Sequence, residues 1–261
     1  MSPEIPATQE RTAILVGADG LARLRRAHVL VAGLGGVGGS AAEALGRAGI
    51  GRITLLDHDT VAPSNLNRQI IALHTTLDRA KAELMAERLH DIDPTIETTV
   101  LTDFLRPEDT DALVARAPYD FILDCIDSIA CKAALVAAAQ RAGRPIASSM
   151  GAGGRLDPTR IRIVTLNQTH TCALAREMRK SLKSLGARLN YPVVFSDEPP
   201  VVKGLPHQPV GGPAGRPRAV NGTISYMPAL FGLTLAGHAI RTLLAVDVDV
   251  DVDVDSDKLT R

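Results

Sequence analysis

The chain has 261 residues, 45% of which are hydrophobic, and its formal net charge is zero. This composition can bury the core of one large domain, or of one domain with an extension. The polar N-terminus argues against a secretory signal, and three cysteines without a Cys-x-x-Cys pair argue against a disulfide framework and a zinc ribbon. We therefore expect a cytoplasmic protein without structural zinc.

Residues 1–27 are expected to form an N-terminal helical segment, and strands then alternate with helices from residue 28 to residue 149. Such alternation predicts a parallel sheet with helices on both of its faces. The expected strands are 28–32, 52–57, 96–101, 119–125 and 145–149, and the expected helices cover about 36–48, 78–90, 107–116 and 128–142.

The pattern changes after the glycine-rich stretch 151–154. The expected elements are then strands at 160–165 and 192–196, a basic amphipathic helix at 171–185, a Pro- and Gly-rich loop at 197–221, and a closing helix at 228–245. The apolar stretch around the closing helix contains Tyr226, Pro228 and His238, which favours a buried helix over a membrane span. The tail 246–261 begins with alternating Val and Asp and is expected to be disordered and of low complexity.

The predicted fold class is therefore α/β, with a Rossmann-like, doubly wound, mostly parallel sheet. Residues 28–150 are the predicted nucleotide-binding subdomain, and residues 151–245 are predicted to be a substrate-binding extension of the same domain. Residues 141–220 contain 13 Lys and Arg but only 4 Asp and Glu. Such a segment suits an anionic partner such as RNA, although solvated helix faces explain it as well on composition alone.

A glycine motif lies directly between the first strand and its helix, where Gly33, Gly35 and Gly38 fit G-x-G-x-x-G. Glycines at these positions allow a tight turn and let the backbone approach a phosphate at the helix N-terminus. Asp57 ends the second strand, where an acidic side chain accepts hydrogen bonds from ribose hydroxyls. These residues predict a nucleotide site, and at this point a nicotinamide-dependent oxidoreductase fits as well as an ATP-dependent enzyme.

Two cations and a carboxylate further along the chain favour ATP. Arg68 and Lys81 are suited to neutralising a triphosphate. Asp127, at the end of the strand 119–125, is suited to holding Mg²⁺ beside those phosphates, because ligands gather at the carboxyl ends of such strands. Each residue has an ordinary alternative, since the cations can be solvated charges and Asp127 can cap the next helix. Their combination favours the ATP site.

These motifs resemble the ubiquitin-activating-enzyme-like superfamily, which includes the adenylyltransferases of thiamine and molybdopterin biosynthesis. The matching stretches are GLGGVG (33–38), DHD (57–59), SNLNRQ (64–69), the helix start Arg79-Ala-Lys81, and DCIDS (124–128). The resemblance implies three groups of site residues: Gly33, Gly35, Gly36, Gly38, Asp57 and Asp59 against the nucleotide, Asn65, Arg68 and Lys81 on its phosphates, and Asp127 on Mg²⁺.

The resemblance also implies a homodimer. Arg11 matches a family arginine that reaches into the partner subunit's site, although Thr8 stands where the family usually has a second arginine. The implied catalytic residues are therefore Arg11, Arg68, Lys81 and Asp127.

The second half of the chain resembles one branch of that superfamily, the tRNA threonylcarbamoyladenosine dehydratases. The resembling stretches are SMGAGGRLDP (149–158), THTCALAREMRK (169–180), VVFSDEP (193–199) and NGTISYMP (221–228). The branch implies that ATP adenylates the free carboxylate of threonylcarbamoyladenosine in tRNA, and that an internal nucleophile then displaces AMP and closes a ring.

A tRNA carrying this modification is the implied partner, and the basic helix offers a face for it. Arg176, Arg179, Lys180 and Lys183 recur at spacings of three and four, so they share one side of a helix. The weaker candidates for RNA contact are Arg155, Arg216 and Arg218. A solvated charge is the alternative for each of these residues.

Three other functions remain open at this level. An adenylyltransferase would activate the C-terminus of a ubiquitin-like or sulfur-carrier protein and would have little use for the basic segment. A nicotinamide dehydrogenase would need neither Arg68 nor Lys81. A nucleotide-binding scaffold without activity would explain Thr8, but not the retained cations and Asp127.

Overall fold

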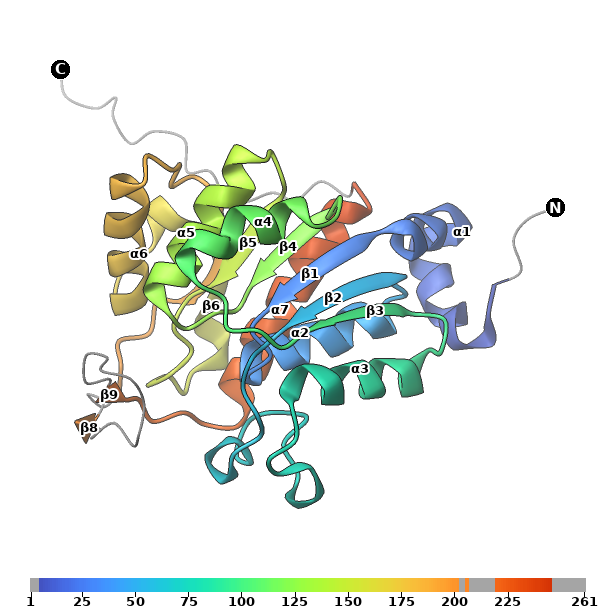
Figure 1. Cartoon of the computed structure of the whole chain (residues 1–261), viewed down its shortest axis with the longest axis horizontal. Helices are drawn as coiled ribbons and strands as arrows, with labels where there is room; N and C mark the ends of the chain where they lie inside the picture. Colours follow the sequence, from blue (N-terminus) through green and yellow to red (C-terminus); the bar gives the residue numbers. More distant parts are fainter. Residues whose placement is uncertain (1–4, 202–204, 207–218, 246–261) are drawn as a thin grey trace.

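The computed structural model describes residues 5–201, 205–206 and 219–245. The tail 246–261, predicted to be disordered, and the weaker RNA-contact candidates Arg216 and Arg218 lie outside these residues. A seven-stranded sheet runs through the molecule in the order β3-β2-β1-β4-β5-β7-β6 (Figure 1). Its strands are β1 (His28–Ala32), β2 (Arg52–Leu56), β3 (Glu97–Leu101), β4 (Phe121–Asp124), β5 (Ile146–Ser149), β6 (Ile161–Thr165) and β7 (Pro192–Ser196). A separate two-stranded ribbon pairs β8 (Leu205–Pro206) with β9 (Ala219–Val220).

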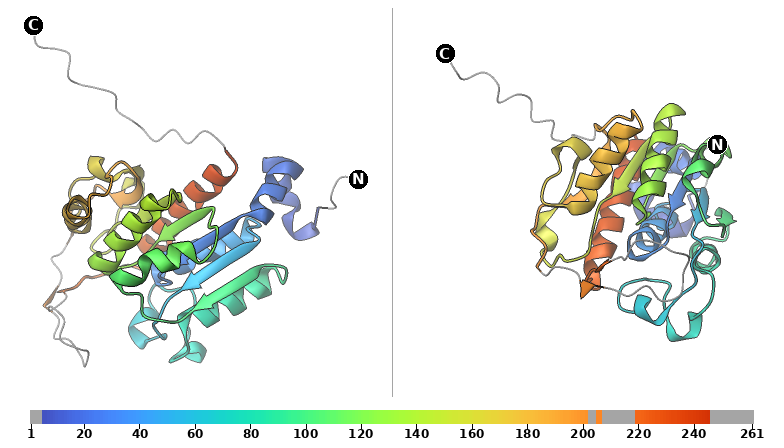
Figure 2. Two further views of the ribbon diagram at one scale, coloured as in Figure 1. Left: turned by 45° about the horizontal axis from the view of Figure 1, so that its top comes forward. Right: turned by 60° about the vertical axis from the view of Figure 1, so that its left-hand side comes forward.

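Helices cover both faces of the sheet. The α-helices among the described residues are α1 (Glu10–Arg26), α2 (Gly36–Arg47), α3 (Lys81–Ile92), α4 (Thr110–Ala115), α5 (Ile129–Arg141), α6 (Ala173–Ser184) and α7 (Tyr226–Leu243). Helices α2, α3 and α7 lie on one face, and α4, α5 and α6 lie on the other (Figures 1 and 2). The predicted α/β, doubly wound architecture is confirmed.

Strand direction and order define the switch point of the sheet. Strands β1 to β5 and β7 are parallel, and only β6 runs antiparallel, against β7. Strand β1 lies between β2 and β4, so the chain leaves β1 in one direction along the sheet and returns on its other side. The crevice at the carboxyl ends of these strands is where ligands bind in open α/β sheets.

Alternating side chains of each central strand feed two cores. In β1, Val29 and Val31 face the α2, α3 and α7 side, whereas Leu30 and Ala32 face the α4, α5 and α6 side. All four are fully buried. Strands that are buried on both faces read as continuous apolar runs, which is why His28–Ala32 is predictable from its sequence.

The predicted elements agree with the structure within one to three residues, and the differences have local causes. Helix α3 begins at Lys81 rather than at Asp78, because Asp78 has a positive φ of 63° and Ala80 bridges to Thr60. The predicted helix at 107–116 starts with a 3₁₀ turn, Pro107–Asp109, before α4. Helix α1 is kinked at Gly17, which has a φ of 72°.

The closing helix α7 packs against α2. A Cβ atom at Gly232 would lie 2.2 Å from the carbonyl oxygen of Val37, so only glycine permits this approach of the two helices. This contact explains the apolar composition of α7. Within the described residues, we find no helix with both the length and the apolar character needed to cross a membrane.

Candidate functional site

A cavity of about 510 Å³ opens at the carboxyl ends of β1, β2, β4 and β5. The residues expected to hold a nucleotide or its metal converge on it from separate loops. Those that line the cavity are Gly33, Gly35, Gly36, Asp57, Asp59, Asn65, Arg68, Lys81 and Asp127. The structure therefore brings together residues that are spread over almost 100 positions of the chain.

The glycine loop between β1 and α2 depends on two close contacts. Gly33 has a φ of 88°, and a Cβ there would lie 2.8 Å from the carbonyl oxygen of Cys125. A Cβ at Gly38 would lie 1.7 Å from the carbonyl oxygen of Gly33, so this glycine closes the turn from behind and does not line the cavity. At Gly35 the nearest atom would be 3.7 Å away, so the backbone there faces open space. These contacts leave the backbone of the loop accessible to a phosphate.

Asp57 ties the end of β2 to the glycine loop. Its Oδ2 accepts a hydrogen bond from the backbone N–H of Leu34 at 2.6 Å, and its Oδ1 accepts one from the N–H of Asp59 at 2.9 Å. The side chain is buried, with 9% of the residue exposed. A carboxylate offers about four lone-pair positions, so Asp57 can accept further bonds from ribose hydroxyls.

The predicted phosphate-binding side chains lie on the opposite wall. Lys81 is the first residue of α3 and only 5% exposed, and its Nζ is 2.9 Å from Oδ2 of Asp59. Arg68 donates to the carbonyl oxygen of Ser64 at 2.9 Å. Buried Asn65 accepts from the N–H of Ala62 at 3.1 Å and so shapes the turn that holds Arg68. Two cations thus face a cavity whose other wall is a glycine loop, which is the arrangement that suits a polyphosphate.

The donor set suits a magnesium ion bound together with phosphates. Asp127 lines the cavity just before α5, and the carboxylates of Asp57 and Asp59 line it from β2. The ligand atoms of Asp57, His58 and Asp59 lie within 4.8 Å of one another, and this is the only such cluster of three among the described residues. Mg²⁺ prefers oxygen ligands and is commonly held by one or two carboxylates plus substrate phosphates.

One wall of the cavity is apolar and was not predicted from the sequence. Its members share no motif and come from four loops: Leu56, Phe104, Leu105, Ile126 and Cys131. Phe104 remains 58% exposed and meets His58 edge to face, with ring centroids 4.7 Å apart. A planar purine fits such a wall, because apolar and aromatic surfaces dominate small-molecule sites.

A buried polar network under the cavity was also missed. Asp124 at the end of β4 and Lys132 in α5 are both fully buried, and the Lys132 ammonium is 3.0 Å from the Asp124 carboxylate. Ser148 donates to Asp124 at 2.6 Å, and Tyr191 contacts Ser148 at 3.2 Å. Burial raises the pKa of the Asp124 carboxyl, and the nearby Lys132 ammonium opposes this shift. The available sequence signal was the position of Lys132 inside an otherwise apolar helical stretch.

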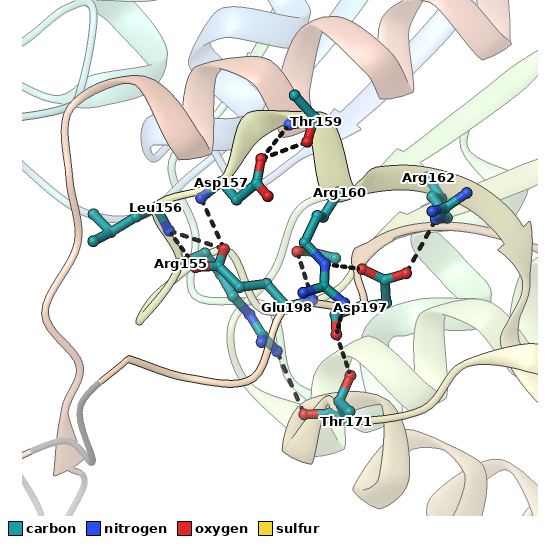
Figure 3. A network of polar contacts seen from close by, with 10 residues as sticks. Arg155, Leu156, Asp157, Thr159, Arg160, Arg162, Thr171, Asp197 and Glu198 are labelled. Carbon is teal, nitrogen blue, oxygen red and sulfur yellow. Dashed lines mark hydrogen bonds and ion pairs between the residues drawn. The ribbon is translucent and has the colours of Figure 1, made fainter.

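The basic segment divides into exposed and engaged residues. Arg176, Lys180 and Lys183 on α6 are exposed to solvent. Arg179 is half-buried and donates to the carbonyl oxygen of Thr169 at 2.9 Å. Arg155 is only 4% exposed, and its side chain points toward Thr171 (Figure 3). The expected single basic face is therefore reduced to three exposed side chains, and their role in RNA binding stays a prediction.

Two neighbouring carboxylates fix the loops around Arg155. Glu198 accepts hydrogen bonds from the backbone N–H groups of Leu156 and Asp157, each at 2.9 Å (Figure 3). Asp197 pairs with Arg160 and Arg162. These contacts hold the end of the stretch 151–157 against β7, and its first part, Gly151 to Gly153, lines the cavity.

Arg11 is not brought to this cavity. It is exposed on α1, which lies at the end of the sheet where β1 begins, away from the carboxyl ends of the strands (Figure 1). Within one chain it therefore has no contact with the candidate nucleotide site.

Comparison with known proteins gives a consistent result. The model of the ThiF family matches residues 9–254. The tRNA threonylcarbamoyladenosine dehydratase of Escherichia coli is 38% identical over 251 residues, which cover 90% of this chain and 92% of that protein. The crystal structure of the E. coli tRNA N6-threonylcarbamoyladenosine dehydratase in complex with ATP has a TM-score of 0.80 and 38% identity, and covers 90% of this chain and 93% of that one. The sulfur carrier protein ThiS adenylyltransferase of E. coli is 39% identical, but over 143 residues and only 54% of this chain.

Proposed function

The chain belongs to the ThiF family, and we propose that it catalyses the ATP-dependent dehydration of threonylcarbamoyladenosine in tRNA. The observation that supports this most is the convergence of a glycine loop, a ribose-binding carboxylate and two phosphate-binding cations on one cavity. The similarity to tRNA threonylcarbamoyladenosine dehydratase covers both the residues of this cavity and the extension beyond it, with 90% of the chain aligned.

ATP is proposed to lie along the floor of the cavity. Its adenine would rest on the apolar wall around Phe104 and its ribose on Asp57. The phosphates would follow the backbone of Gly35 and Gly36 toward Arg68. Mg²⁺, when bound, would be held by Asp127 together with the phosphates, and it would neutralise charge that develops on the leaving pyrophosphate.

The reaction would proceed in two displacements. The free carboxylate of the modified base attacks the α-phosphorus of ATP and forms an acyl adenylate, while pyrophosphate leaves. A nucleophile of the same modification then attacks the activated carbonyl carbon, AMP leaves, and a ring closes. One carboxylate oxygen leaves with AMP, so the base loses the elements of water. The protein contributes mainly orientation and fixed charges, with Arg68 and Lys81 facing the phosphates.

A homodimer is proposed because the N-terminal arm exposes apolar side chains beside Arg11. Ile14 and Leu15 are 77% and 87% exposed, and a hollow of about 590 Å³ next to them is lined by Ile5, Ala7, Glu10, Ala13 and Ile14. Exposed apolar surface of this kind usually marks a protein contact. A second copy that covers the arm would bring Arg11 toward the partner subunit's site, as the resemblance implies.

The tRNA is proposed to approach over α6, whose start reaches the cavity through Leu174. Its exposed cations Arg176, Lys180 and Lys183 would contact phosphates. Arg155 and Arg179 would shape this surface from below, since both are engaged within the protein. A tRNA substrate and three unpaired cysteines fit a cytoplasmic location.

The decisive measurement is AMP formation from ATP with tRNA that carries threonylcarbamoyladenosine, compared with unmodified tRNA, followed by mass spectrometry of the nucleosides. We expect AMP and the loss of one water from the modified base in the first case only. ATP–pyrophosphate exchange that needs a ubiquitin-like or sulfur-carrier protein, and no change in the base, would instead favour the alternative adenylyltransferase.

A further inference from the structure

A fully buried ammonium group holds the turn that precedes Asp127. Nζ of Lys132 is 3.0 Å from the Asp124 carboxylate, and it also donates to the carbonyl oxygens of Asp124 at 3.2 Å and of Ile126 at 3.1 Å. An ammonium group has three protons to donate. All three partners of Lys132 therefore belong to a turn of three residues at the carboxyl end of β4.

The far side of the Asp124 carboxylate is equally restrained. Its Oδ1 accepts from the backbone N–H of Ile126 at 3.2 Å, and its Oδ2 accepts from the Ser148 hydroxyl at 2.6 Å. Tyr191, just before β7, contacts that hydroxyl at 3.2 Å. The turn is thus fixed from α5, from β5 and from the start of β7.

Stability alone does not account for this pair. Removing two charges from water is costly, and well-packed apolar side chains of similar volume often serve the fold as well. An apolar side chain at position 132 could not donate to the carbonyl oxygens of Asp124 and Ile126. Because a peptide group is planar, fixing the carbonyl of Ile126 also fixes the direction of the N–H of Asp127. The specific contribution of Lys132 is therefore the orientation of the backbone that leads into Asp127.

We propose that Lys132 is a positioning residue, which orients Asp127 through the turn 124–126 so that its carboxylate meets ATP-bound magnesium. The inference rests on the proposed function in one respect, the assignment of Asp127 to the metal. Residues that orient a metal ligand in this way change metal affinity or activity by roughly 10- to 100-fold when they are replaced.

The test is a charge-balanced double variant, Asp124→Asn/Lys132→Met, which removes the hold on the carbonyls without leaving an unpaired buried charge. Calorimetry without tRNA measures the affinity for ATP in EDTA and in magnesium. We expect similar affinity in EDTA, but a loss of roughly 10-fold in the gain that magnesium confers. The kcat for AMP formation should fall with it, while the KM for tRNA stays unchanged.

Two further variants separate positioning from folding. Asp124→Asn/Lys132→Gln restores one donor and should recover part of the magnesium gain, and it serves as the test if the methionine variant does not fold. Arg25→Met/Asp93→Asn removes another ion pair, 2.8 Å long and outside the cavity lining, and should lower only the melting temperature.

Three results would overturn the proposal. In the first, the methionine double variant melts at a lower temperature but keeps the full magnesium gain. In the second, the glutamine variant recovers none of that gain although it folds. In the third, Asp127→Ala in the otherwise unchanged protein leaves the gain intact. A wild-type protein that binds ATP with magnesium but forms no AMP with modified tRNA would refute the proposed function instead, and these binding measurements would still decide the role of Lys132.

Discussion

The two sides of the cavity are held by polar contacts of different kinds. Under the nucleotide side, Asp124 and Lys132 form an ion pair with both side chains fully buried. On the substrate side, Asp197 pairs with Arg160 and Arg162, which are 42% and 59% exposed (Figure 3). Water and salt weaken exposed pairs far more than buried ones. We infer that the nucleotide wall is a rigid platform, whereas the substrate wall depends more on its surroundings, so substitutions should separate ATP chemistry from RNA binding.

The largest effect is expected at Lys81, on the nucleotide side. Lys81→Ala removes a buried cation that faces the phosphate region, and we expect AMP formation to slow by roughly 10²- to 10³-fold. Its partner Asp59 is 53% exposed, so water can solvate the remaining carboxylate and the melting temperature should change little. The rate of AMP release from ATP and modified tRNA measures the effect.

Arg79→Ala is the matched control for Lys81→Ala. Arg79 lies two residues earlier, is 46% exposed and pairs with Glu87 on the surface. It should leave the rate within about two-fold, since exposed ion pairs contribute little. Equal rates for the Lys81 variant and the wild type would remove Lys81 from the catalytic residues.

Glu198 tests the substrate side. Glu198→Gln leaves one carbonyl oxygen where two carboxylate oxygens accept from Leu156 and Asp157, and the loss of a buried hydrogen bond costs about 1–3 kcal/mol of unfolding free energy. Because the stretch 151–153 lines the cavity, we expect a higher KM for tRNA at an unchanged KM for ATP. Steady-state kinetics with each substrate varied in turn would show this. An equal rise in both KM values would contradict the separation of the two sides.

A smaller effect is expected from the exposed cations of α6. Lys180→Glu/Lys183→Glu should weaken tRNA binding, and the slope of the logarithm of the binding constant against the logarithm of salt concentration should fall by about one for each phosphate that the protein no longer neutralises. The affinity for ATP should not change. The control Arg23→Glu/Arg26→Glu makes the same charge change on α1, at the opposite end of the sheet (Figure 1). If both double variants weaken tRNA binding equally, the effect reflects net charge and α6 is not the RNA surface.

Prediction from sequence succeeded where short-range signals fix both the turn and the chemistry. Gly33 and Gly35 follow directly on a buried strand, and Asp57 ends the next strand, so the switch point of the sheet brings them together. Arg68 and Lys81 follow within the same local pattern. Spacing along the chain is enough here, because parallel strands end at one edge of the sheet.

Prediction failed where burial depends on contacts between distant segments. Arg155 was expected at the surface, but it is 4% exposed within loops that Glu198 holds together. Lys132 gave no functional signal, because its role requires Asp124 and Ser148 on two different strands. A charged residue looks the same in the sequence whether it ends in solvent or in the core, so these roles emerge only from the packed structure.

The smallest effect concerns pH, and it sharpens the same contrast, since an interior that admits only paired charge should resist protonation of a buried base. His238 in α7 is 6% exposed and packs edge to face on Phe121 of β4. Burial, with a smaller effect from the positive charge of Arg241, lowers the pKa of His238 below its ordinary value of 6.5. The neutral form is therefore the one that the fold stabilises. Its contribution to the unfolding free energy is complete above pH 6.5 and is lost as the pH falls below that value toward the lowered pKa.

His238→Leu should remove part of this dependence. Denaturant unfolding at pH values between about 7 and 5 should show a smaller loss of stability in the variant than in the wild type. His28 retains the rest, because burial, followed by the charge of Arg52, also lowers its pKa. The control His74→Leu replaces an exposed histidine and should leave the wild-type pH profile unchanged. Parallel profiles for His238→Leu and the wild type would mean that the core around Phe121 accommodates a charge, and the nucleotide side would then be less rigid than its buried ion pair indicates.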